Sequence, residues 1–224
     1  MSFNLNNQKK GGGGVPQDLI EVGTIPGRVV RIIDLGLQPG GSFEGKDKPN
    51  SYQVDVTYEL SDVFMKDKDG NEDETKPRWI SESFPMHHPS ADLAKSTKRC
   101  NAFDPKHEHN YDLGKMIGAP VMITIVHKTS KGKTYANVGN VSVMRDKDAA
   151  KCPELKNESI VFTLDDPDLE IFNKFPDWLK DKIKGNLEFK GSKLDILLSG
   201  GDAKQKEVPQ ETEQGTDEEE GEGW

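Results

Sequence analysis

The sequence predicts a mainly β fold: a five-stranded Greek-key barrel with short helical insertions, followed by a small C-terminal helical lobe. Three features support this fold class. Short apolar or alternating runs, separated by turn residues, follow one another between residues 20 and 144. A helical stretch interrupts them after the third run, and helix-forming segments follow from about residue 150. We therefore expect the barrel at residues 19–149 and the lobe at residues 150–200.

The composition limits the class of protein. Only 33% of the 224 residues are hydrophobic, whereas ordinary globular chains have roughly 45–50% apolar residues with glycine included. No apolar run approaches the ~20 residues of a membrane-spanning helix, and the N-terminus lacks an apolar signal segment. The two cysteines, Cys100 and Cys152, fit a reduced, cytoplasmic protein without a membrane anchor.

Residues 1–18 are expected to form a flexible arm. Four consecutive glycines, Gly11–Gly14, have no side chains to pack and leave the backbone free. Lys9 and Lys10 make the arm weakly basic. The arm is therefore either a plain solvated leader or a weak contact to a phosphate backbone.

The first three strands are expected at residues 29–33, 52–60 and 78–84. The first run is β-branched, and the second alternates strictly between apolar and polar side chains. The polar stretch 66–77 has a turn-forming Asp-Gly pair and predicts the hairpin loop before the third strand. We expect one face of the second strand to lie in the core, with Tyr52, Val54, Val56, Tyr58 and Leu60.

The last two strands are expected at residues 121–127 and 133–143, joined by a tight turn. Before them, the segment 90–99 predicts a short helix with Ser90 as its N-cap. Three strands, a helical insertion and two further strands is the order of an OB-fold, the Greek-key barrel that binds oligonucleotides. A β-sandwich stays open as an alternative, because strand order cannot be derived from one sequence.

The lobe at residues 150–200 is expected to contain one strand and one clear helix. The strand is predicted at residues 158–164. The helix is predicted at residues 176–184, because proline suits its first turn and Gly185 ends it. The expected apolar face of this helix consists of Trp178, Leu179 and Ile183.

The net charge of −9 is distributed unevenly. Residues 201–224 hold nine acids and two lysines, so residues 1–200 carry only −2. A strongly acidic protein is repelled by nucleic-acid phosphates. That objection therefore applies to the terminal segment and not to the body.

The segment 201–224 is expected to be a disordered acidic tail. Such tails often serve solubility alone, but a tryptophan as the last residue favours a peptide that docks into a pocket. The pocket would belong to a partner protein, or the tail would occupy the DNA-binding surface of the body. The residues proposed to make these contacts are Asp217, Glu218, Glu219, Glu220, Glu222 and Trp224.

Basic and aromatic residues alternate at several places in the body. Single-stranded nucleic acid favours this mixture, because cations neutralise phosphates and aromatic rings stack on bases without regard to sequence. The alternative is that the aromatic residues belong to the core; we favour it for Tyr52, Tyr58 and Phe103 and leave it open for Trp79 and Tyr135. The candidate DNA-binding residues are Arg28, Arg31, Arg78, Trp79, Lys98, Arg99, Lys128, Lys131, Lys133 and Tyr135.

No metal, cofactor or catalytic motif is predicted. The histidines at 87, 88, 107 and 109 and Cys100 lack the spacing of zinc ligands. The loop 67–71 places its glycine too early for a calcium-binding loop. Neither a nucleophile elbow nor a phosphate-binding loop occurs. A metal-dependent nuclease that uses Asp55, Glu59 and Glu82 stays as the less favoured enzymatic alternative.

Several segments resemble the single-stranded DNA-binding proteins of tailed bacteriophages. The similarity lies in residues 27–39, 52–60, 98–105 and 175–184, and in the acidic tail with its terminal aromatic residue. The resemblance implies an OB-fold and sequence-independent binding of single-stranded DNA in phage replication, recombination and repair. It also implies that the tail contacts replication proteins such as the DNA polymerase or helicase, in the cytoplasm of the infected bacterial host. One departure is that many such tails end in phenylalanine, whereas this one ends in Trp224.

The sequence therefore predicts a non-enzymatic protein that binds single-stranded DNA. The first alternative is a replication adaptor that binds proteins and not DNA, and the nuclease is the second. Self-association and the preference for DNA over RNA stay open, because no residue pattern addresses them.

Overall fold

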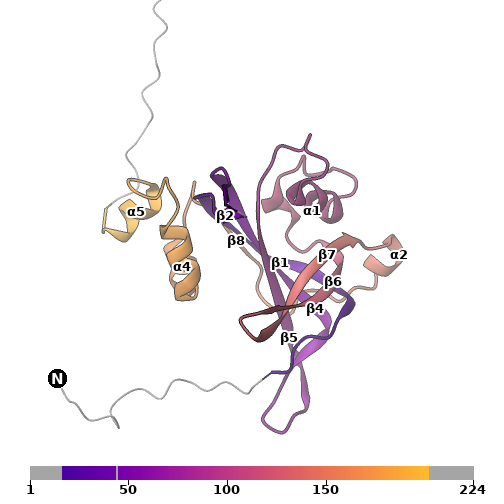
Figure 1. Cartoon of the computed structure of the whole chain (residues 1–224). Coiled ribbons are helices and arrows are strands. Elements are labelled where there is room, and N and C mark those ends of the chain that lie inside the picture. Colours follow the sequence, from indigo (N-terminus) through magenta and orange to yellow (C-terminus); the bar gives the residue numbers. More distant parts are fainter. Residues whose placement is uncertain (1–16, 44, 202–224) are drawn as a thin grey trace, which may run out of the picture.

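The computed structural model describes residues 17–43 and 45–201, and it is mainly β (Figure 1). The predicted arm at residues 1–18 and tail at residues 201–224 lie almost wholly outside these described residues. The strands are β1 (Gly23–Gln38), β2 (Ser42–Phe43), β3 (Lys46–Asp47), β4 (Ser51–Lys66), β5 (Glu72–Pro85), β6 (Pro120–Ser130), β7 (Lys133–Val143) and β8 (Ile160–Phe162). The helices are α1 (Lys95–Phe103), the 3-10 helix η2 (Leu113–Met116), α2 (Asp146–Ala149), α3 (Leu169–Lys174), α4 (Asp177–Lys184) and α5 (Lys193–Leu198).

One six-stranded sheet dominates the fold. Its order is β5-β4-β1-β6-β7, with all neighbours antiparallel, and β8 pairs with β1 in parallel. Strand β1 changes partners along one edge: its first half pairs with β6, and residues Arg31–Ile33 pair with β8. The five strands predicted for the barrel are present, and the strand predicted at residues 158–164 is found as β8.

The alternation in β4 places four of its side chains in the core. Val54, Val56, Tyr58 and Leu60 are buried on one face, as predicted. Tyr52 is a correction, because its side chain is 48% exposed and its hydroxyl donates to Glu188 Oε1 at 2.8 Å. The opposite face of β4 is also buried, although it is polar. The sequence predicts a small lobe at residues 150–200 that packs on the barrel, and the backbone N–H groups of Lys156 and Asn157 donate to Glu59 on this face.

Helix α1 begins later than the sequence pattern indicates. Residues 90–94 form turns, and the helix starts at Lys95 without a capping side chain. A buried ion pair fastens it to the sheet: Arg99 Nε and Nη2 donate to the Glu82 carboxylate of β5 at 2.6 and 3.2 Å. Tyr58 Oη donates to the same carboxylate at 2.8 Å. The Arg99 guanidinium also donates to Asn140 Oδ1 of β7 at 3.4 Å, so α1 links β5 to β7.

Helices α4 and α5 lie together beside the sheet (Figure 1), and this C-terminal part of the chain has its own hydrophobic cluster. Ile33 and Leu35 project from β1 into this cluster, where Leu179 and Ile183 of α4 meet them. Helix α4 confirms the predicted segment 176–184, but Trp178 is a correction, because its side chain is 57% exposed. In the described residues, no helix is long and apolar enough to cross a membrane.

Candidate nucleic-acid interface

The outer face of the sheet carries a cation stacked on an exposed aromatic ring. Arg31 of β1 places its guanidinium carbon 5.4 Å from the centre of the Trp79 ring of β5, and its Nε donates to Thr57 Oγ1 at 3.3 Å. Trp79 is 37% exposed. Because alternate residues of a strand point to one face, Ser81 and Ser83 continue this exposed row along β5. We call these residues of β1, β4 and β5 the outer sheet face.

The carboxylates on the outer sheet face are already engaged. Glu59 accepts the Trp79 indole N–H at 3.4 Å and the Lys156 backbone N–H at 2.7 Å. Asp55 accepts the Ser83 hydroxyl at 2.7 Å. Burial raises the pKa of Asp55, and the Ser83 hydrogen bond and the charge of Arg31 oppose that effect. Both acids are nearly inaccessible to solvent, so the half-buried Arg31 and the exposed Trp79 are the more accessible groups here.

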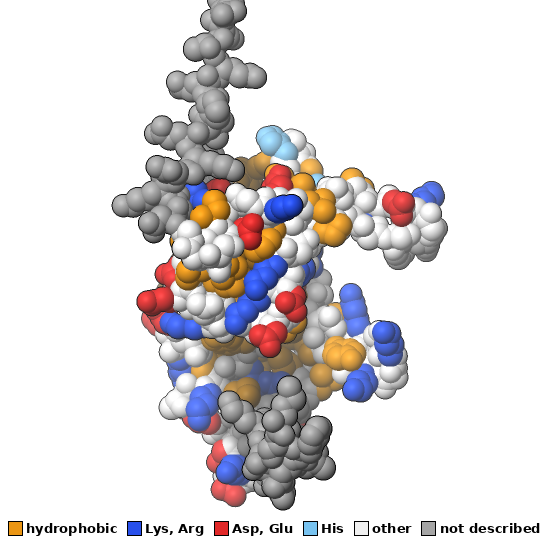
Figure 2. Space-filling view, turned by 90° about the vertical axis from the view of Figure 1, so that its left-hand side faces the viewer, with side chains coloured by type: hydrophobic (Ala, Val, Ile, Leu, Met, Phe, Trp, Pro, Cys, Tyr) orange, Lys and Arg blue, Asp and Glu red, His pale blue; other side chains and the backbone are white. Residues whose placement is uncertain are grey.

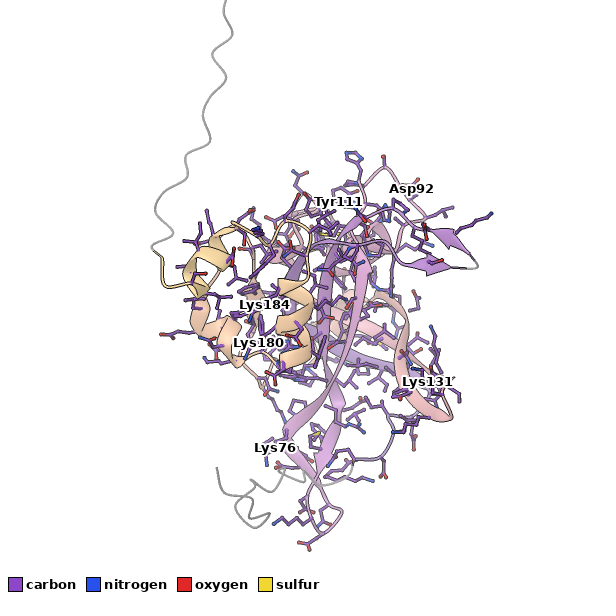
Figure 3. The ribbon with its side chains drawn as sticks, turned by 60° about the vertical axis from the view of Figure 1, so that its left-hand side comes forward. Lys76, Asp92, Tyr111, Lys131, Lys180 and Lys184 are labelled. Carbon is purple, nitrogen blue, oxygen red and sulfur yellow. The ribbon has the colours of Figure 1, made fainter. Side chains whose placement is uncertain are left out.

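The hairpin between β6 and β7 carries the second set of predicted side chains. Lys128, Lys131, Lys133 and Tyr135 are all exposed, and Lys128 lies directly opposite Tyr135 across the two strands. Lys131 and Gly132 form the tight turn, both with positive φ. Figure 3 shows Lys131 at the tip of this hairpin, on the far side of the long strands from α4. In Figure 2 the hairpin projects from the body, with blue Lys side chains around its tip.

Two predicted arginines are committed to contacts within the protein. Arg28 donates to the carbonyl oxygens of Gly118, Cys152 and Pro153 at 2.8, 3.0 and 2.8 Å, and it also pairs with Glu154. Arg99 is 2% exposed and bound to Glu82. These partners use the donors that a phosphate would need. We therefore correct their predicted role from phosphate contact to structural link.

Arg78 and Lys98 lie away from the Arg31–Trp79 pair. Arg78 precedes Trp79 in β5 and so points to the other face, where its Nη1 donates to the Asp18 carbonyl oxygen at 2.7 Å. Lys98 is exposed on α1. Of the predicted site residues, the structure brings together two groups: Arg31 with Trp79, and the three lysines with Tyr135.

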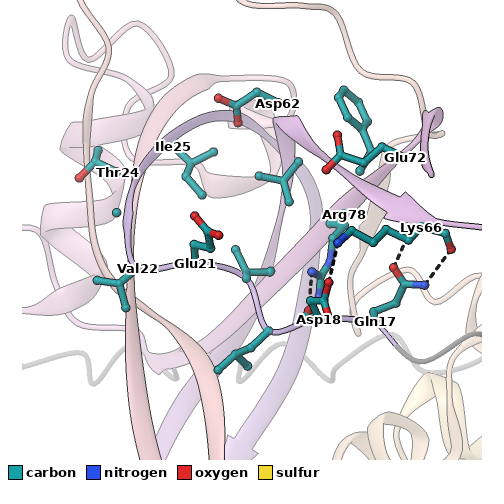
Figure 4. Close-up of a pocket in the computed structure, with 15 residues that line it drawn as sticks. Gln17, Asp18, Glu21, Val22, Thr24, Ile25, Asp62, Lys66, Glu72 and Arg78 are labelled. Carbon is teal, nitrogen blue, oxygen red and sulfur yellow. Dashed lines mark hydrogen bonds and ion pairs between the residues drawn. The ribbon is translucent and has the colours of Figure 1, made fainter. Parts of the chain in front are cut away.

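A cavity of about 380 Å³ lies beside Arg78, between the segment 17–25 and the β4–β5 hairpin (Figure 4). Its polar lining is mainly acidic, and its lysine, Lys66, pairs with Asp18 at 2.5 Å. An acidic lining disfavours a nucleic-acid phosphate. The acidic residues that line the cavity are Asp18, Glu21, Asp62 and Glu72.

The three carboxylates considered for a nuclease, Asp55, Glu59 and Glu82, do not form one cluster. Asp55 and Glu59 lie on the outer sheet face, whereas Glu82 points inward to Arg99 and Tyr58. Among the described residues, no group of three His, Cys, Asp or Glu side chains could hold a metal ion. Both cysteines are buried, and burial raises the pKa of the Cys100 thiol to about 11.

Sequence reasoning did not single out Lys182 of α4, which interacts electrostatically with Asp55 of the outer sheet face. The helix was recognised, but Trp178 was assigned to its apolar side. Leu179 and Ile183 are four residues apart and form a narrow apolar stripe by themselves. This spacing could have indicated that Trp178 lies outside the buried stripe.

The proposed contact residues of the tail, including Trp224, lie outside the described residues. No family model matches this chain, and no curated protein matches it significantly.

Proposed function

We propose that this protein is a bacteriophage single-stranded DNA-binding protein that works without catalysis in the cytoplasm of the infected host. The observation that carries the proposal is the Arg31–Trp79 pair, a cation and an exposed ring stacked side by side on the outer sheet face. The exposed hairpin lysines extend the basic surface. The sequence resemblance to phage proteins supports the same function.

The strand order supports an OB-fold for the core. In chain order, the five long strands lie 3-2-1-4-5 across the sheet, and α1 comes between the third and the fourth. Closing this sheet into a Greek-key barrel requires the two edge strands, β5 and β7, to meet. They approach within 8 Å, and α1 bridges them through Arg99.

Single strands suit this surface better than duplex DNA. In a duplex the base faces are stacked inside, whereas a single strand offers them to Trp79 and Tyr135. Stacking on an aromatic ring tolerates any sequence, because every base has a π-face. We therefore propose sequence-independent binding, with Arg31 and the hairpin lysines on phosphates.

Replacing Trp79 by alanine is expected to weaken binding to oligo-dT. Stacking on one base contributes about 1–3 kcal/mol, which corresponds to a rise in Kd of about 5- to 150-fold. The Kd would be measured by fluorescence anisotropy with a labelled oligo-dT, and duplex DNA of equal length would serve as the control. Trp79→Phe keeps an aromatic face and should recover most of the affinity. An alanine variant that binds like the parent protein would contradict the stacking role.

Deleting residues 207–224 is expected to strengthen DNA binding. This segment contains eight acids and no bases, so its removal eliminates a polyanion that competes with DNA for the cations of the body. The Kd for oligo-dT should fall, and the fall should shrink at high salt as screening increases. A truncated protein with equal or weaker affinity would exclude competition by the tail. Loss of binding to the phage polymerase or helicase would support the proposed partner role.

The adaptor and the nuclease remain the alternatives. An adaptor would leave single-stranded DNA open to an added nuclease, whereas the proposed function predicts protection. A metal-dependent nuclease would degrade the DNA itself when a divalent ion is added. One protection assay with and without Mg²⁺ therefore separates all three functions.

A further inference from the structure

Helix α4 extends the outer sheet face, and this inference rests on the proposed binding of single-stranded DNA. We propose that Trp178 is a second stacking platform and that Lys182 is a second phosphate-binding cation beside Arg31. The strand would then contact the C-terminal part of the chain as well as the sheet.

Lys182 lies over the same face as Arg31. Gln38 Nε2 donates to the Lys182 carbonyl oxygen at 3.1 Å, which fixes this turn of α4 at the end of β1. The Lys182 ammonium interacts electrostatically with Asp55 of β4. Asp55 is also attracted to Arg31 and bonded to Ser83 of the exposed row. The two cations therefore flank one buried carboxylate on the outer sheet face.

Trp178 is on the same side of α4 as Lys182, because residues four apart in a helix share a face. Its side chain is 57% exposed, whereas its neighbour Leu179 is fully buried in the hydrophobic cluster. The opposite side of the helix faces α3, where the Lys184 ammonium lies 5.8 Å from the centre of the Phe172 ring (Figure 3). Leu179 and Ile183 form the side that packs on β1, so Trp178 lies at the exposed border of this contact, on the flank that carries Lys182.

The direction of α4 places Trp178 beside the middle of β1. Phe175, just before the helix, packs on Phe162, which pairs with Ile33. Beyond the helix, the Leu187 N–H donates to the Leu37 carbonyl oxygen at 2.8 Å. Helix α4 therefore runs from the level of Ile33 to that of Leu37, with its first turn at the Ile33 end. Ile33 lies two residues after Arg31 in β1, and it pairs with Asp55 of β4.

The chemistry of this surface favours a single strand of DNA over an apolar protein partner. The outer sheet face that Trp178 would extend carries Arg31 and the exposed serines Ser81 and Ser83 next to Trp79. Trp79 and Trp178 would stack on bases, and Arg31 and Lys182 would bind the phosphates between them. Aromatic rings together with cations are typical of surfaces that bind single strands. A protein that docks on Trp178 is the alternative outcome of the test below.

The test uses the full chain with Trp178→Ala. The Kd for oligo-dT should rise about tenfold, in line with the loss of one stacked base. Trp178→Phe should recover most of this affinity, and it should also reduce the quenching of tryptophan fluorescence that DNA causes. Lys180→Gln is the matched control for Lys182→Gln, because both remove one charge from α4 but on different sides. Only the Lys182 change should weaken binding.

The outcomes separate this inference from the proposed function. If the parent protein does not bind oligo-dT, the proposed function fails. If the parent protein binds and Trp79→Ala weakens it, but Trp178→Ala and Trp178→Phe leave Kd and quenching unchanged, the inference about α4 is overturned and the function stands. Urea unfolding controls for stability, because Lys182→Gln removes a counter-charge from the buried Asp55 carboxylate.

Discussion

Replacing Arg99 by alanine is expected to lower the free energy of unfolding by about 3–5 kcal/mol, because it leaves a buried carboxylate without its counter-charge. Glu82 has 6% of its side chain exposed and depends on Arg99, Lys95 and Tyr58 for partners. Lys95 is 41% exposed and binds one carboxylate oxygen, so it compensates only in part. Urea unfolding followed by circular dichroism would measure the loss.

Lys98→Ala is the matched control, since it removes a cation from the same helix at an exposed position. Its effect should stay within about 0.5 kcal/mol, as for most surface substitutions. If Arg99→Ala lowered the free energy of unfolding by no more than Lys98→Ala does, the buried Arg99–Glu82 pair would not stabilise the packing of α1 on the sheet.

The same pair makes stability depend on pH in acid. Burial alone would raise the pKa of Glu82, but the hydrogen bonds from Arg99 and Lys95 outweigh burial and hold the pKa below its ordinary value of 4.5. A carboxyl with a lowered folded-state pKa contributes stability above its unfolded-state pKa and loses it as pH falls through the folded-state pKa. The urea concentration at the unfolding midpoint should therefore decrease as the pH is lowered below about 4.5. In Arg99→Ala this decrease with pH should be less steep.

Local patterns predicted the strands because each strand carries its own signal. The alternation of β4 and the β-branched start of β1 identify these two strands. The pairing of β8 with β1 had no such signal, since it joins residues about 130 positions apart. The residues just before β8 bond Glu59 and help to bury the outer sheet face. Alternation predicts which side chains share a face, but it does not predict which distant segment covers that face.

The same limit applies to the candidate site. The exposure of the hairpin lysines could be predicted because it follows from a tight turn, whereas the sequence left Trp79 open between the core and a stacking role. Arg28 and Arg99 were placed wrongly because an arginine can be buried only with partners, and those partners lie far away in the chain. Glu82 is 17 residues from Arg99, and the Cys152 carbonyl is 124 residues from Arg28.

Removing the three hairpin lysines is expected to change the salt dependence of DNA binding more than any other substitution. Each phosphate contact contributes about 0.7 to the slope of log K against log salt for single strands, so three contacts contribute about 2. Lys128→Gln, Lys131→Asn and Lys133→Gln remove the charges. Asparagine is chosen at 131 because it tolerates the positive φ of 50° found there, which alanine does not.

The matched control removes three exposed or half-exposed lysines elsewhere: Lys174→Gln, Lys180→Gln and Lys190→Gln. Both triple variants lose the same net charge, so any effect of overall charge on association is equal in the two. Binding to oligo-dT would be titrated between 50 and 400 mM NaCl. The hairpin variant should bind more weakly at low salt and converge with the parent protein at high salt, because counterion release is the term it has lost. Equal slopes in the two variants would mean that the hairpin meets no phosphates and that DNA, if bound, follows the Arg31–Trp79 face alone.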